Sequence, residues 1–148
     1  MPTPIEIVNT MMAKDYFSQW LGINVLEIKP GTCKLIMTVT KDMLNGFGIA
    51  HGGITYSLAD SALAFASNSH GKKAVSVETS ISHTTSLLEN DEIIAEATEE
   101  HCSDKIGIYT IKVTNTKTNK TVGLFKGTVY RTSQHWEANK RLNYSPDH

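Results

Sequence analysis

The sequence has few cysteines, almost no net charge and no long apolar run, and each of these shortages excludes a class of protein. Its two cysteines, Cys33 and Cys102, have neither the spacing of a metal site nor that of a secreted disulfide framework. A formal net charge of -1 offers no electrostatic basis for binding nucleic acid or an anionic membrane. No apolar run approaches the roughly 18 residues of a membrane span, and the N-terminus lacks the basic and apolar regions of a leader. We therefore expect a cytoplasmic protein whose partners are neither nucleic acid nor membrane.

The overall composition is that of one soluble globular domain. The chain has 148 residues, of which 40% are hydrophobic and 20% are charged, as is ordinary for a single folded domain. It has no Gly-x-Ser-x-Gly motif, and neither cysteine lies in a reactive context, which disfavours the common serine and cysteine hydrolases. The alternating apolar residues around Cys33 indicate that its thiol is a small core group.

Apolar periodicity predicts an α+β domain. An amphipathic helix is expected at residues 5–21, with Ile5, Phe17 and Trp20 among the residues of its apolar side. Alternating patterns predict strands at 23–29, 32–40, 73–81, 92–100, 105–114 and 121–131. Between the second and third strands, a helix at roughly 54–69 is apolar on nearly every side and is therefore expected to be buried. We expect an antiparallel sheet of five to six strands wrapped around this one long central helix, with exposed edges that a second copy could pair with.

Three parts are expected along the chain. Residues 1–22 form an N-terminal helix of the same domain, 23–132 form the body of the domain, and 133–148 form a polar tail that is expected to be frayed. No internal repeat, linker or low-complexity segment divides the sequence.

The central helix carries an isolated carboxylate. Asp60 is the only formal charge between residues 43 and 71 when the histidines are neutral. Such a carboxylate is costly to desolvate without a partner, so Asp60 is either a structural group bonded to backbone donors or a functional one. At the start of the helix, Gly52 and Gly53 leave backbone N–H groups unobstructed, and these can stabilise an oxyanion. A carboxylate and oxyanion donors are the parts that hydrolysis of an activated acyl group requires.

Helix geometry separates these two parts. Gly52 and Asp60 are eight residues apart, which corresponds to about 12 Å along a helix axis at about 1.5 Å per residue. Both groups must lie roughly 3 Å from the reacting atoms, so one helix cannot present both to the same carbonyl. We therefore expect a homodimer whose two-fold axis brings Asp60 of one chain to Gly52 of the other.

Several stretches resemble the hotdog-fold thioesterases of the phenylacetate-degradation (PaaI) type. They are residues 37–40, 43–46, 51–53, 57–62, 66–68, 107–109, 113, 120–122 and 124–127. The resemblance extends from about residue 21 to residue 131, and the spacing Asn…His-Gly-Gly…Asp is specific within that superfamily. It implies a hotdog fold, homodimers paired as a dimer of dimers, and hydrolysis of acyl-CoA thioesters, most of all those of the hydroxyphenylacetyl type. It also implies that no metal, cofactor or prosthetic group is needed.

The resemblance implies a role for each matching residue. It assigns the thioester carbonyl to the Gly52 N–H, and it makes Asp60 the nucleophile or general base. Asn45 would lie beside the substrate or the attacking water, and His51 would support the loop or the substrate. The candidate substrate-binding residues are Gly53, Ser61, Ser76, His83 and Thr84, of which Ser76 matches a serine that only some relatives use.

Two segments depart from the family pattern and bear on substrate choice. Thr85 and Ser86, preceded by His83, stand where relatives often have an Arg-Pro pair, and residues 47–50 form a variable part of the loop. These segments are expected to line the acyl pocket or the CoA entrance. The polar run at 82–86 could receive a ring hydroxyl.

Two alternatives use the same fold. A hotdog hydratase or dehydratase would need a carboxylate–histidine pair for proton transfer at carbon, whereas the Asn45, Gly52 and Asp60 layout fits attack by water. A non-catalytic acyl-CoA sensor would carry a DNA-binding segment, but the first 22 residues are too short and too weakly basic for a helix-turn-helix.

Overall fold

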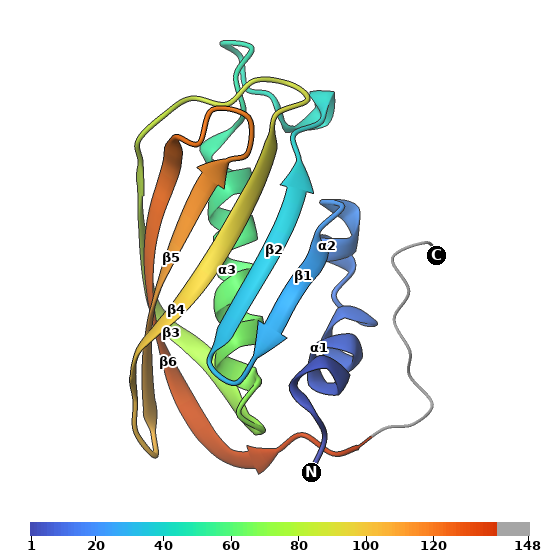
Figure 1. The fold of residues 1–148 in the computed structure, drawn as a ribbon, viewed down its shortest axis with the longest axis vertical. Helices are drawn as coiled ribbons and strands as arrows, with labels where there is room; N and C mark the ends of the chain where they lie inside the picture. Colours follow the sequence, from blue (N-terminus) through green and yellow to red (C-terminus); the bar gives the residue numbers. More distant parts are fainter. Residues whose placement is uncertain (139–148) are drawn as a thin grey trace.

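In the computed structural model, which describes residues 1–138, a curved six-stranded sheet wraps around one long helix (Figure 1). The elements in chain order are α1 (Pro4–Met12), α2 (Tyr16–Trp20), β1 (Asn24–Lys29), β2 (Thr32–Thr38), the 3₁₀ turn η1 (Lys41–Met43), α3 (Gly52–Asn68), β3 (Lys72–His83), β4 (Glu92–Cys102), β5 (Ile106–Asn115) and β6 (Thr121–His135). Every strand pair is antiparallel, and the order across the sheet is β1-β2-β4-β5-β6-β3. The predicted α+β architecture is confirmed.

The helix α3 lies against the concave face of the sheet, and its small residues allow a close approach. Leu58, Ala59, Ala62 and Phe65 have no exposed surface. On β6, a Cβ at Gly127 would lie only 2.5 Å from Cδ2 of Leu63, so no larger residue fits there without a shift. The core is therefore the interface between α3 and the inward-facing residues of the sheet.

One side of α3 is not covered by the sheet. Gly53 is exposed, and Ser57, Asp60 and Ala64 are only partly buried, although most of their neighbours on the helix are fully buried. Their spacing of three to four residues places them along a single stripe of the helix. This stripe is the part of α3 that a partner could contact.

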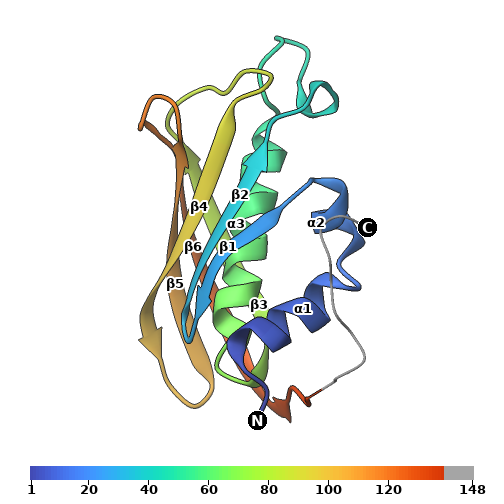
Figure 2. The same ribbon diagram turned by 45° about the vertical axis from the view of Figure 1, so that its right-hand side comes forward.

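The N-terminal region differs from the prediction of a single helix over 5–21. It forms two helices, because Asp15 caps α2 by accepting a hydrogen bond from the Ser18 N–H at 3.0 Å. The Gln19 side chain donates to the Met12 carbonyl, which satisfies the end of α1. Val8 and Met12 are buried in the core, but Ile5, Phe17 and Trp20, which were expected on the apolar side, are 45%, 55% and 62% exposed, and the two aromatic rings stack on each other. Both helices lie beside α3 at the β1 side of the molecule (Figure 2).

The C-terminal region also differs from its prediction. β6 continues to His135, so residues 133–135, which were expected to be frayed, belong to a strand that pairs with β3. The Trp136 indole then donates to the Asn68 side chain at 2.9 Å, and its backbone N–H donates to the Gly71 carbonyl. The rest of the expected tail, 139–148, lies outside the described residues.

The two edge strands of the sheet are unequal. β1 has six residues, whereas β3 has twelve and exposes Val75 and Val77 at 56% and 62%. A long edge strand with exposed valines offers unpaired backbone groups and apolar surface to a second strand. Among residues 1–138, no helix is both long and apolar enough to cross a membrane.

Candidate active site

A pocket of about 370 Å³ opens at the N-terminal end of α3, between the loop that precedes the helix and the end of β3. Four of the predicted site residues meet there: Asn45, Gly52, His83 and Thr84. The pocket is completed by Ile49, Ala50, Thr55, Thr85, Ser86 and Leu87. Of the two variable segments, Ile49, Ala50, Thr85 and Ser86 line the pocket, whereas Gly48 and Phe47, which is 90% exposed, do not.

The first turn of α3 leaves one N–H available to a ligand. His51 is the N-cap, and its Nδ1 accepts a hydrogen bond from the Gly53 N–H at 3.0 Å. The Gly52 N–H, in contrast, has no acceptor among the described residues. Gly52 also faces His83, since a Cβ at this position would lie 3.0 Å from Nε2 of that histidine. The pocket thus ends on a free donor at the positive end of a helix dipole.

Asn45 shapes the loop and keeps its amide NH₂ free. Its Oδ1 accepts hydrogen bonds from the N–H groups of Phe47 at 2.9 Å and Ile49 at 3.4 Å, which folds the loop back on itself. Its Nδ2 has no acceptor within residues 1–138. Since the residue lines the pocket, this amide is a second donor available to a ligand.

The far wall of the pocket supplies hydroxyl groups. The Oγ1 atoms of Thr84 and Thr85 both donate to the Thr121 carbonyl, at 2.6 and 2.9 Å. Because their hydrogens are already used, these oxygens can only accept from a ligand. Ser82 does not contribute, since it lies in a separate depression with Ser80 and Lys126. Of the polar run at 82–86, only 83–86 line the pocket.

Asp60 does not lie at this pocket. It is half-buried on α3, about two turns beyond Gly52, and its carboxylate has no hydrogen-bond or ion-pair partner among the described residues. Burial raises the pKa of Asp60, and the negative charge of Asp15 raises it further. The structure therefore gives no support to a carboxylate held by backbone donors. The effect of Asp15 on Asp60 was not predicted from the sequence, because only the packing of α2 on α3 brings the two carboxylates close.

The remaining predicted residues lie elsewhere. Ser61 is buried, and its hydroxyl forms a 2.8 Å hydrogen bond with Ser18. Ser76 is exposed on the edge strand β3, where it pairs with Val129 of β6. Thr55 was missed, although its position three residues after Gly52 on a helix could have indicated that the two share a face. For Ser61, Ser76 and Gly53, a substrate-binding role stays a prediction.

A curved antiparallel sheet wrapped around one long helix, with a pocket at the N-terminus of that helix, defines a hotdog-fold protein. A model of the thioesterase superfamily matches residues 47–122, which include the helix α3 and its pocket donor Gly52. The chain belongs to the thioesterase superfamily and is a thioester hydrolase.

Individual relatives agree with this assignment. A putative esterase of Archaeoglobus fulgidus is 42% identical over 88% of this chain and 84% of its own length. The acyl-coenzyme A thioesterase PaaI of Escherichia coli is 37% identical over 83% of this chain and 87% of its own. The solved structure of E. coli PaaI superimposes with a TM-score of 0.86, covering 89% of this chain and 95% of that one. A variant of the phenylacetic acid degradation protein PaaI of Thermus thermophilus superimposes with a TM-score of 0.76 at 37% identity, covering 80% of this chain and 100% of that one.

Proposed function

We propose that this acyl-CoA thioesterase hydrolyses (hydroxy)phenylacetyl-CoA-like substrates to the free acid and CoA. The observation that carries the proposal is that Gly52 lines the pocket at the start of a helix while its N–H has no acceptor among the described residues, as a donor to a carbonyl oxygen requires. Two of the relatives are named for PaaI, and the pocket of this chain has space and polar groups suited to a substituted ring.

In the proposed reaction, the Gly52 N–H stabilises the negative charge that develops on the thioester oxygen. Asp60 of the partner chain either removes a proton from water, whose oxygen attacks the carbonyl carbon, or attacks that carbon itself to form an anhydride that water then opens. In both routes the carbon–sulfur bond breaks and CoA leaves as the thiolate. The free Nδ2 of Asn45 would donate to the substrate or the attacking water. Burial and the negative charge of Asp15 raise the pKa of Asp60, which makes its carboxylate a stronger base.

A homodimer is part of this proposal, and two such dimers would pair as a dimer of dimers. Its support is the absence of Asp60 from the pocket of its own chain, together with the uncovered stripe of α3 and the long edge strand β3. If β3 pairs with its copy across a two-fold axis, the two α3 helices come to lie beside each other. Without the partner, the pocket has an oxyanion donor but no base.

The proposed preference for a hydroxyphenyl ring rests on hydrogen-bond acceptors in the wall of the pocket. Thr84 and Thr85 present oxygens whose hydrogens are committed to Thr121, so a phenolic hydroxyl can donate to them. A site built to bond a hydroxyl discriminates strongly against an analogue that lacks it. We propose that this pair, with His83 nearby, recognises the ring substituent.

A free-thiol assay across a panel of acyl-CoA substrates tests the function. The expected result is a higher kcat/KM for hydroxyphenylacetyl-CoA than for acetyl-CoA or palmitoyl-CoA. A preference for long saturated acyl chains would contradict the proposed preference for aromatic acyl groups, but it would not contradict thioesterase activity. Hydration of crotonyl-CoA without thiol release would favour the hydratase alternative, although the one carboxylate–histidine pair among residues 1–138 lies at the far end of α3.

Two further parts of the proposal concern cofactors and location. Since the donors and the carboxylate are groups of the protein, the reaction should need no metal or prosthetic group, and activity should persist after dialysis against a chelator. A loss of activity there that added metal restores would contradict this. We also propose that the protein acts in the cytoplasm, which fractionation of cells that produce it would test.

A further inference from the structure

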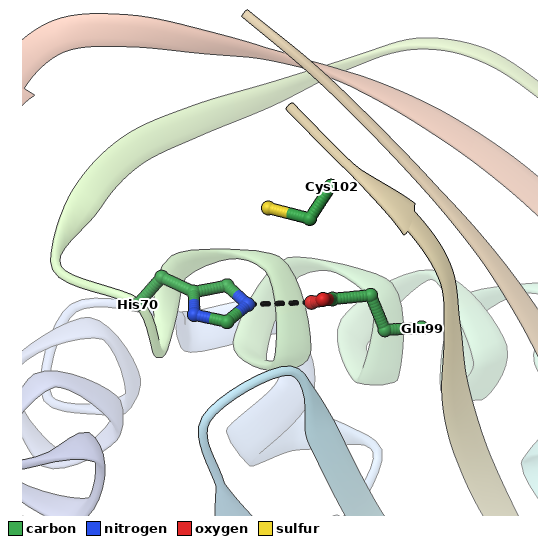
Figure 3. Close-up of side chains that lie close together, drawn as sticks. All are labelled: His70, Glu99 and Cys102. Atoms are coloured by element: carbon green, nitrogen blue, oxygen red, sulfur yellow. Dashed lines mark hydrogen bonds and ion pairs between the residues drawn. The ribbon is translucent and has the colours of Figure 1, made fainter. Parts of the chain in front are cut away.

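A second group of reactive side chains lies at the opposite end of α3 from the pocket. His70 follows the end of the helix, and Glu99 and Cys102 lie near the end of β4 (Figure 3). The His70 ring points directly at the Glu99 carboxylate, with 2.5 Å between Nε2 and Oε2, and the Cys102 sulfur lies to one side of this pair. One donor atom from each residue lies within 4.8 Å of the other two.

A break in the regularity of β4 brings two of these residues together. In a regular strand, residues 99 and 102 would point to opposite faces of the sheet, because side chains alternate. The pairing of β4 with β5 shifts between Glu99 and His101, so that one extra residue is inserted. Such a bulge reverses the alternation beyond it, which allows Glu99 and Cys102 to share a face.

The surroundings hold the carboxylate in place and leave it partly open to solvent. The Tyr109 hydroxyl of β5 donates to the same Oε2 of Glu99 at 2.8 Å. The turn between β1 and β2 closes the cluster with Gly31, whose φ is +80° and where a Cβ would collide with the Glu99 carboxylate. The side chains of His70 and Glu99 remain 24% and 25% exposed, so an ion and water can reach them from solvent.

We propose that His70, Glu99 and Cys102 bind a divalent transition metal of the zinc type, with water as the fourth ligand. Imidazole, carboxylate and thiolate are the donor types that Zn²⁺ takes, at about 2.0–2.3 Å from the ion. Shifts of roughly 1 Å, which open the His70–Glu99 hydrogen bond, would place the three donor atoms around one ion. Tyr109 would then orient the ligating carboxylate from behind.

The charges balance once the ion is bound. The Cys102 thiol releases its proton to solvent and binds as the thiolate, so the two negative charges of Cys102 and Glu99 neutralise the divalent ion. Burial raises the pKa of the Cys102 thiol, and the nearby Arg131 opposes this rise by favouring the thiolate. Arg131 also repels a cation, and its Nη1 donates to the Ser103 carbonyl at 2.5 Å, which fixes the guanidinium without removing its charge. No electron transfer or further reactant is involved.

The bound ion would join the end of α3 to the end of β4. This role does not depend on the proposed thioesterase chemistry, since the helix of 17 residues places the cluster about 25 Å from the pocket. It predicts a metal that raises stability without being needed for turnover.

The test uses the full chain, freed of metal by a chelator and titrated with Co²⁺ and Zn²⁺. We expect one ion per chain, a thiolate-to-cobalt charge-transfer absorption in the near ultraviolet, displacement of Co²⁺ by Zn²⁺ and a higher Tm with either ion. Cys102→Ser should abolish the absorption even though Cys33 remains, because that thiol is only 2% exposed in the core. His70→Gln and Glu99→Gln should each weaken binding at least about tenfold.

Neighbouring residues of β4 serve as matched controls. Glu100→Gln and His101→Gln remove the same types of side chain from outside the cluster and should bind Co²⁺ as the unaltered chain does. Circular dichroism and the Tm of each metal-free variant would establish that it folds, and Cys102→Ala replaces Cys102→Ser if it does not. Absence of saturable binding, absorption that survives loss of Cys102, or equal weakening in the His101→Gln control would overturn the proposal.

Discussion

At the scale of single residues, Asp60 has an environment that disfavours its charged form. It is a half-buried carboxylate without a partner in its own chain, next to the negative Asp15. Burial without compensation is expected at functional groups, where it tunes a pKa, and is unexpected at purely structural ones.

Asp60→Asn should therefore lower kcat by on the order of 10²–10⁴-fold while leaving the fold intact, because it removes the base or nucleophile and preserves size. Steady-state thiol release measures the loss, and circular dichroism checks the fold. Turnover at the level of the unaltered enzyme would remove Asp60 from the mechanism.

The same variant carries a prediction about stability and pH. Because the pKa of Asp60 is raised above its usual 3.8, the folded state binds its proton more tightly than the unfolded state does. Ionisation of Asp60 therefore lowers the stability of the fold as the pH rises from about 3.8 toward the raised pKa. Below pH 3.8 this loss of stability is absent. Asp60→Asn should give a Tm equal to or above that of the unaltered protein at pH 7, with a difference that vanishes below about pH 3.8. A clear drop in Tm at pH 7 would favour a structural role instead.

Asp15→Asn tests the second cause of the raised pKa. Asparagine keeps an oxygen to cap α2, but it removes the negative charge, so the pKa of Asp60 should fall. The acidic limb of the profile of kcat/KM against pH should then move to lower pH, while the plateau stays unchanged. Glu6→Gln, which neutralises an exposed carboxylate in α1, is the control and should leave the profile in place. If the acidic limb of the pH profile does not move in Asp15→Asn, the ionisation of Asp60 does not determine that limb.

At the scale of elements, the first residue of α3, Gly52, offers a backbone N–H donor at a position where the backbone conformation also tolerates proline. Gly52 is the first helical residue, where proline fits, and His51 before it has a ψ of 133°, which suits the residue preceding a proline. Gly52→Pro should lower kcat by on the order of 10²–10³-fold, since one oxyanion donor contributes about 2.7–4 kcal/mol.

A matched control separates the lost donor from the added bulk. Any Cβ at residue 52 comes within 3.0 Å of the His83 ring, so Gly52→Ala adds this contact but keeps the N–H. We expect Gly52→Ala to retain much more activity than Gly52→Pro in the thiol-release assay. If both variants lose the same amount, crowding against His83 explains the loss, and the oxyanion donor lies elsewhere.

The elements that the sequence predicted well are those with a strong local period. All six strands and α3 are where alternation and the apolar run indicated, and the pocket end of α3 was indicated by Gly52 and His51. The break between α1 and α2 was missed, because Asp15 acts as a cap only through a local hydrogen bond that the apolar pattern does not record. The extension of β6 to His135 was missed for a different reason, since its polar residues are held by pairing with β3, far away in sequence. The cluster of His70, Glu99 and Cys102 has no sequence signature, because a β-bulge assembles it.

At the scale of the whole molecule, the two parts of the proposed catalytic site lie at different places on one chain. The pocket holds Gly52 and Asn45 but not Asp60, and Asp60 lies on the stripe of α3 that the sheet leaves uncovered. A second copy across a two-fold axis would bring each Asp60 to the other chain's pocket, which forms two equivalent sites per dimer. A monomer is then expected to be inactive.

Mixing two inactive variants tests this arrangement. In a mixed dimer of an Asp60→Ala chain and a Gly52→Pro chain, one site combines both defects. The other takes Asp60 from the Gly52→Pro chain and Gly52 from the Asp60→Ala chain, so it is intact. Random exchange of equal amounts makes half of the dimers mixed, and activity should rise from near zero to about a quarter of that of the unaltered enzyme. Exchange is followed with two differently tagged chains, and Asp60→Ala mixed with itself is the control. Confirmed exchange without recovery of activity would show that each chain builds its site alone.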